Sequence, residues 1–162
     1  MKKLIFLLSV CLLLVVCSCK KSSTKPANVA GTLTVTIGGK AQTFNVGAVA
    51  HLDNTGGFNT LGIIGVQSTT TANSLVITVS STGPITAKSY TDANSESQLS
   101  YTTAAGAIYQ DDGTSGTSST VTIKSISSTN VQGTFSGTLM LITGTGAATQ
   151  TFTNGSFNLD IK

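Results

Sequence analysis

His51 and Asp53 are the two residues whose types and spacing come nearest to a catalytic or metal-binding pair. Residues two apart in a strand point to the same face, so an imidazole and a carboxylate would lie side by side. A zinc shell or a catalytic constellation needs further ligands or a nucleophile, but His51 is the only histidine and no cysteine follows Cys19. We therefore expect an exposed His51 at the edge of a loop, no cofactor and no enzymatic activity.

The segment from Asp111 to Gly116 has the oxygen-rich composition of a cation-binding loop. An EF-hand loop requires alternating ligands, a terminal Glu and flanking helices, and the sequence supplies none of these here. A turn between strands is the favoured interpretation, and a weak calcium site at the surface is the alternative. Asp92 and Glu96 are interpreted as solvated loop residues, without a partner carboxylate for glycoside chemistry.

Tyr90, Tyr101 and Tyr109 are the candidates for a recognition surface, because tyrosine rings can stack on sugars or line an interface. The chain has no tryptophan, which argues against a strong carbohydrate platform. The alternative is that the three rings close the core, with their hydroxyl groups in water.

The charge balance argues against nucleic acid as a partner. The formal net charge is +3, but five of the nine lysines lie within residues 1–25. Residues 31–162 hold four lysines and six acidic residues, a net charge of −2. Without a basic patch, binding through phosphate contacts is not expected.

The N-terminus has the features of a secretion signal. Two lysines precede an apolar run from Leu4 to Cys17, which as a helix would span about 21 Å, short of a bilayer core of about 30 Å. Of the three cysteines, Cys19 alone follows a small residue, Ser18. The stretch Val16-Cys17-Ser18-Cys19 resembles the lipobox of bacterial lipoproteins, although that family usually has Leu and then Ala or Ser at the first two positions.

The resemblance implies cleavage after residue 18 and attachment of fatty acyl chains, such as palmitate, to Cys19. Two or more chains give firm membrane binding at about 0.8 kcal/mol per buried CH₂. Lys20 follows, in place of the Asp that favours retention at the inner membrane, so the resemblance points to the outer membrane. We expect residues 1–18 to be the signal peptide, residues 19–30 a lipidated tether and residues 31–162 one β domain.

The domain shows the period-two alternation of half-buried strands, with no amphipathic helix. Alternating runs begin with Leu33, Val35 and Ile37 and end with Phe157, Leu159 and Ile161. Gly38-Gly39 is typical of a tight hairpin turn, and Ala93–Gln98 has room for one helical turn. The pattern predicts an antiparallel β-sandwich of nine or ten strands, with a flattened, lipocalin-like barrel as the alternative.

The last part of the chain, from Gly133-Thr134-Phe135-Ser136-Gly137 to Asn154-Gly155-Ser156-Phe157, resembles a family of small bacterial envelope lipoproteins. These proteins share an N-terminal glycine hairpin and a final strand opened by an Asn-Gly turn. The resemblance implies a secreted β domain and brings no catalytic residues.

Two functions follow as hypotheses. The first is a non-enzymatic binding or structural module of the cell envelope, with a protein or polysaccharide partner. The second is a barrel carrier of a small apolar ligand, which predicts an interior cavity lined by residues such as Leu75, Ile77 and Phe135.

Overall fold

Alternating side chains create strands with one buried face. The computed structural model describes residues 31–67, 70, 73–114 and 116–162. In β1 (Thr32–Ile37) the side chains of Leu33, Val35 and Ile37 are buried, and the threonines between them are half-buried. The fold is all-β and antiparallel, which confirms the predicted class. The predicted signal, tether and lipidated Cys19 lie outside the described residues.

The described residues form eleven strands and one short 3-10 helix. After β1 they are, in chain order, β2 (Lys40–Thr43), β3 (Val46–Asp53), β4 (Asn59–Val66), β5 (Ser74–Ser81), β6 (Ser89–Thr91), η1 (Asp92–Asn94), β7 (Ser97–Thr102), β8 (Ile108–Gln110), β9 (Ser118–Ile126), β10 (Asn130–Thr143) and β11 (Thr149–Asp160). Among the described residues, no helix has the length and apolar composition needed to cross a bilayer.

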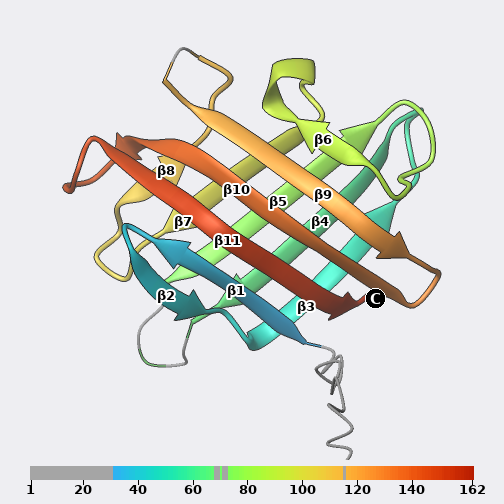
Figure 1. The fold of residues 1–162 in the computed structure, drawn as a ribbon, viewed down its shortest axis with the longest axis horizontal. Helices are drawn as coiled ribbons and strands as arrows, with labels where there is room; N and C mark the ends of the chain where they lie inside the picture. Colours follow the sequence, from blue (N-terminus) through green and yellow to red (C-terminus); the bar gives the residue numbers. More distant parts are fainter. Residues whose placement is uncertain (1–30, 68–69, 71–72, 115) are drawn as a thin grey trace, which may run out of the picture.

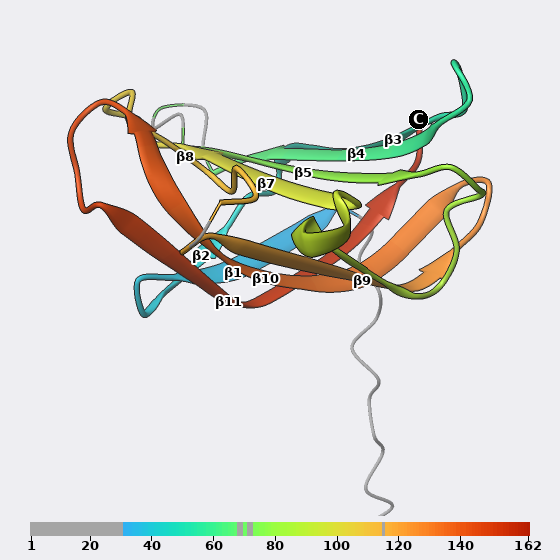
Figure 2. The same cartoon turned by 90° about the horizontal axis from the view of Figure 1, so that it is seen from above.

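All the strands belong to one curled sheet. Its order is β2-β1-β11-β10-β8-β7-β5-β4-β3, with β9 paired to β10 and β6 paired to β9 (Figure 1). Seen from above, the sheet bends into two facing layers, with β3, β4, β5 and β7 in one layer and β1, β9, β10 and β11 in the other (Figure 2). The sheet is thus both sandwich-like and barrel-like.

The long strand β10 joins the two layers at a fork. Its first part pairs with β9, from Val131 to Thr138, and its last part pairs with β8, from Met140 to Thr143. The strand therefore changes partners along its length, and the β8–β9 connection leaves the sheet where the partners change.

The opposite side of the sheet is closed by the end of β11. Ile161 forms an isolated parallel bridge with Ala50 of β3, and the Lys162 N–H donates to the Ala50 carbonyl at 2.9 Å. The Ile161 N–H donates to the Thr129 carbonyl at 2.9 Å. The bridge and the Lys162 bond link the layer that contains β11 to the layer that contains β3, and the Ile161 bond holds the chain to the β9–β10 turn.

The glycine hairpin forms as predicted. Gly38 and Gly39 have φ values of 54° and 81°, which are left-handed conformations open to glycine. The returning strand β2 ends at Thr43, and Phe44 lies between β2 and β3. The Phe44 ring is fully buried, and the backbone N–H of Phe44 donates to the Leu33 carbonyl at 2.7 Å.

The predicted Asn-Gly turn at Asn154 is wrong, because Asn154 and Gly155 lie inside β11. At this point the register shifts in the pairing of β11 with each of its two neighbours. Here β11 has one more residue than the facing part of β1 or of β10. Asn154 adopts a φ of 52°, a conformation that Asn tolerates at a β-bulge as well as at a turn.

The space between the layers holds one apolar cluster, whose buried members run from Leu33 to Leu159. Leu75 and Ile77 are fully buried in it, and Phe135 is 3% exposed. None of the three surface depressions that we describe is lined by Leu75 or Ile77, and Phe135 lines a shallow one on the outside of β9, β10 and β11. The packing gives no support to the carrier hypothesis.

Candidate functional site

The three candidate tyrosines do not form a recognition surface; their rings close the core, as the alternative interpretation has it. Tyr90, Tyr101 and Tyr109 are 0%, 5% and 2% exposed and belong to the apolar cluster. Each occupies an inward position of its strand, and the Tyr101 ring packs edge-on against Phe44 and Phe152 at centroid distances of 6.2 and 5.6 Å. Their rings therefore cannot be offered to a ligand.

His51 is exposed in β3 and does not form a pair with Asp53. Its Nδ1 lies 2.6 Å from the backbone oxygen of Lys162. The Asp53 carboxylate instead accepts the Thr55 N–H at 3.0 Å, which closes a local turn. Within the described part of the chain, no three His, Cys, Asp or Glu side chains are grouped so that they could hold a metal ion.

Polar side chains gather instead in a pair of adjoining depressions near η1 and the β8–β9 connection, which we call the acidic groove. Each depression has a volume of about 280 Å³, and the two share Ser80, Ser95 and Glu96. The other lining residues are Thr78, Asp92, Ser97, Gln98, Asp111, Asp112 and Gly113 in the first, and Phe58, Ser81, Thr82 and Asn94 in the second.

Asp111 lines the first depression and is only 2% exposed. Its Oδ1 accepts the Leu99 N–H at 3.0 Å, and its own N–H donates to the Leu99 carbonyl at 3.2 Å. Beside it, the buried hydroxyl groups of Ser97 and Ser119 are 2.7 Å apart and connect β7 to β9. Asp111 thus extends the pairing of β7 by one residue at the fork.

The second carboxylate oxygen of Asp111, Oδ2, is buried and has no hydrogen-bond partner among the described residues. Burial raises the pKa of Asp111, and the negative charge of Asp92 acts in the same direction. Interactions with the Ser119 hydroxyl and the Leu99 N–H oppose that shift. The result is a buried carboxyl group that holds a proton more tightly than an ordinary aspartate.

Asp112 behaves differently, because it points into its own loop. Its Oδ1 accepts the Thr114 N–H at 3.0 Å, the Thr114 hydroxyl at 2.6 Å and the Thr117 hydroxyl at 3.2 Å. These bonds, led by the one from the Thr114 hydroxyl, lower the pKa of Asp112, which is therefore held in its charged form. The segment connects β8 to β9, in agreement with the predicted turn.

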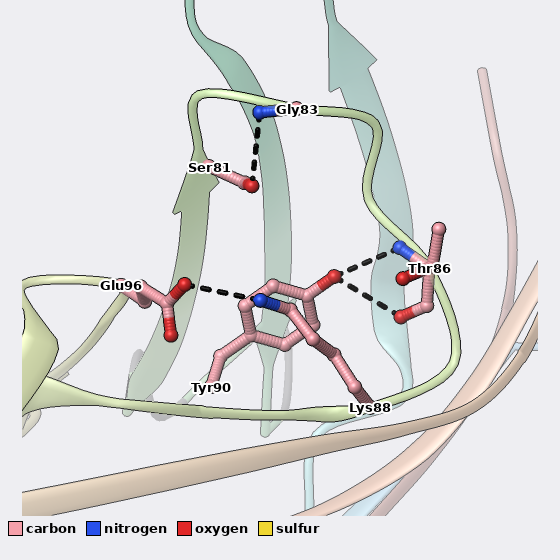
Figure 3. Close-up of polar contacts among 6 residues, drawn as sticks. All are labelled: Ser81, Gly83, Thr86, Lys88, Tyr90 and Glu96. Carbon is pink, nitrogen blue, oxygen red and sulfur yellow. Dashed lines mark hydrogen bonds and ion pairs between the residues drawn. The ribbon is translucent and has the colours of Figure 1, made fainter.

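Glu96 lies between the two depressions and is held by Lys88. The Lys88 ammonium is 3.1 Å from Glu96 Oε1 and 4.5 Å from the centre of the Tyr90 ring (Figure 3). The Tyr90 hydroxyl accepts the Thr86 N–H at 2.8 Å and donates to the Thr86 carbonyl at 3.1 Å. These contacts fix the segment that crosses from β5 to β6 beside the groove.

The remaining residues of the groove come from short local elements. The helical turn predicted within Ala93–Gln98 is the 3-10 helix η1, which begins earlier, at Asp92, while β7 begins at Ser97. Phe58 precedes β4 and is 58% exposed, the largest exposed fraction among the large hydrophobic side chains that the structure describes. It places an aromatic ring at the far end of the groove from Asp111.

One feature of the sequence could have predicted this groove, namely the distribution of the acidic residues. Four of the six acidic residues of the domain fall between Asp92 and Asp112, and interpreting them singly as loop residues concealed that they share a site. Comparison with known proteins adds nothing to this assignment, since no protein-family model, curated protein or solved structure matches the chain.

Proposed function

We propose that the chain is a lipoprotein of the bacterial cell envelope, in which Cys19 carries the lipid and residues 31–162 form a non-enzymatic binding module. The N-terminal sequence supports the anchor, with a basic start, a short apolar run and a small residue before Cys19. The module's binding region in this proposal is the acidic groove, since its polar side chains line a depression and the tyrosines do not.

The observation that carries the proposal is the position of the groove relative to the start of β1. The described chain begins at one edge of the molecule, and η1, which lines the groove, lies at the opposite edge (Figure 1). A domain tethered through the residues before β1 would therefore present the groove away from the membrane. The eleven residues from Lys20 to Ala30 could extend to at most about 40 Å, which keeps the domain near the bilayer.

The anchor is tested by expressing the full chain and its cysteine variants in a Gram-negative host and separating membranes from soluble protein. We expect the unaltered chain and Cys11→Ala in the membrane fraction and Cys19→Ala in the soluble fraction. Cys11→Ala is the matched control, because it makes the same change within the apolar run. Membrane retention of Cys19→Ala would overturn the lipoprotein assignment.

A further inference from the structure

The acidic groove concentrates negative charge. Asp92, Glu96, Asp111 and Asp112 all line it, and they are four of the six acidic residues of the domain. The lining residues include no lysine, and Lys88 contacts the groove only through its ion pair with Glu96. Four of the six acidic residues of the domain therefore share one site, where Lys88 balances the charge of Glu96.

A second feature points to a ligand that donates hydrogen bonds. Asp111 lines the groove and is 2% exposed, and its buried Oδ2 has no hydrogen-bond partner among the described residues. The nearby Ser119 hydroxyl lies 2.7 Å from the Ser97 hydroxyl and also interacts with the Asp111 carboxyl group, without forming a hydrogen bond to Oδ2. A buried acceptor without a donor costs free energy, which a donor that enters the groove would recover.

Asp92 and Asp112 each use one carboxylate oxygen in hydrogen bonds within the domain and leave the other oxygen without a bond that we describe. Asp92 Oδ1 accepts the Ala93 N–H at 2.9 Å, and Asp112 Oδ1 accepts the bonds of its own loop. The hydrogen bonds that we describe for both residues involve Oδ1, so Oδ2 of each can accept from a ligand. These groups are spread along the groove and do not converge as metal ligands, which favours several separate donors over one metal ion.

The ring of Phe58 adds a different kind of contact. It is 58% exposed at the end of the groove farther from Asp111. A guanidinium group stacks on an exposed aromatic ring while its N–H groups pair with a carboxylate, and an ammonium group gains a similar attraction. A chain with alternating cationic side chains would match both the ring and the carboxylates.

We propose that the acidic groove binds a segment of a partner protein that carries two or more Arg or Lys side chains. Cationic side chains pair with Asp92, Glu96 and Asp112, a donor approaches Asp111, and an Arg stacks on Phe58. This inference names the partner class of the binding module proposed above and rests on it. It requires no anchor, so it can fail while the lipoprotein assignment stands.

The test measures binding of fluorescent (Gly-Arg)₄ and (Gly-Glu)₄ peptides to the full chain in detergent by fluorescence anisotropy. We expect (Gly-Arg)₄ to bind and (Gly-Glu)₄ not to bind. The affinity for (Gly-Arg)₄ should fall about tenfold between about 20 mM and about 200 mM NaCl, because salt screens exposed charges. No binding of (Gly-Arg)₄ at the lower salt concentration would overturn the proposal.

Paired variants separate a specific groove from general attraction to an acidic protein. Asp92→Asn/Asp112→Asn should weaken binding about tenfold, whereas Asp53→Asn/Asp160→Asn, with the same change in net charge outside the groove, should change it less than about twofold. Phe58→Ala should weaken the binding of (Gly-Arg)₄ more than the binding of (Gly-Lys)₄. Equal losses in the two paired variants would overturn the proposal.

A glycan array, probed with the same full chain, gives the competing outcome. The chain could instead bind a neutral oligosaccharide, with an affinity that does not change with salt and that is lost in Phe58→Ala. This result would assign the groove to a saccharide and would overturn the peptide proposal. No bound glycan, together with salt-sensitive binding of (Gly-Arg)₄, would support it.

Discussion

Asp111 and Leu99 hydrogen-bond to each other in both directions at the fork of the sheet. The Leu99 N–H donates to Asp111 Oδ1 at 3.0 Å, and the Asp111 N–H donates to the Leu99 carbonyl at 3.2 Å. The side chain thereby replaces a backbone acceptor where β8 has ended and β9 has not yet begun. A carboxyl group that is 2% exposed is thus used as part of the sheet.

This arrangement makes stability depend on pH. Because the pKa of Asp111 is raised in the fold, mainly by burial, the folded state binds its proton more tightly than the unfolded state. The stabilisation is complete below the usual aspartate pKa and is lost as the pH rises through the raised value. Relative to Asp111→Asn, the unaltered protein should lose stability over that range, as measured by urea denaturation at a series of pH values.

The Asn side chain retains an oxygen for the Leu99 N–H and cannot ionise, so Asp111→Asn removes the titration and keeps that hydrogen bond. Asp111→Ala removes the acceptor and leaves a buried N–H unsatisfied, at an expected cost of about 1–3 kcal/mol at any pH. The same pH dependence in Asp111→Asn as in the unaltered protein would show that another group is responsible.

Gly137 is required by the close approach of three strands at the same fork. A Cβ at Gly137 would collide with the Ser118 carbonyl oxygen and lie 3.3 Å from Leu99 Cδ1. Gly137→Ala should therefore destabilise the fold by about 1–3 kcal/mol in urea denaturation. Gly83→Ala is the control, because a Cβ at Gly83 meets no atom within 4 Å. If Gly137→Ala and Gly83→Ala unfold at the same urea concentration, the packing at the fork is not tight.

The Tyr90 hydroxyl holds the segment that crosses between the layers. Tyr90→Phe keeps the buried ring under Lys88 but removes both hydrogen bonds to Thr86. We expect a loss of about 0.5–1.5 kcal/mol per bond and faster hydrogen exchange at the Thr86 amide. Exchange at Thr86 that is unchanged by the substitution would show that the hydroxyl does not fix this segment.

The bulge at Asn154 gives a test by backbone conformation. Its φ of 52° is accessible to Gly and Asn but costs other residues about 1–2 kcal/mol. Asn154→Ala should therefore destabilise the domain by about that amount, and Asn154→Gly should leave it within about 0.5 kcal/mol, as measured by thermal or urea unfolding. A neutral Asn154→Ala would indicate that β11 is paired without the bulge.

The strands were predictable because a period of two is a local signal. The alternation at Leu33, Val35 and Ile37 specifies a buried face without reference to the rest of the chain. The partner change of β10 was not predictable, since it depends on pairing between segments far apart in sequence. The turn assigned to Asn154 failed because the same positive φ serves a turn and a bulge.

The site was harder to predict than the fold. Whether Tyr101 faces the core or the solvent depends on which side of its strand is covered, and this is decided by the opposite layer. The acidic groove combines residues from η1 with residues from the β8–β9 connection, and the pairing of β7 with β8 brings them together. Residue types in the sequence identified the carboxylates but not their common location.

The most direct test of the account is the mass of the mature N-terminus. The full chain, expressed in a lipoprotein-processing host and extracted from membranes, is digested and its N-terminal peptide is analysed by mass spectrometry. If Cys19 is the lipid anchor, the peptide begins at Cys19 and its thiol is joined to a diacylglyceryl group. An N-terminus at another residue, or an unmodified Cys19 thiol, would contradict the lipoprotein assignment.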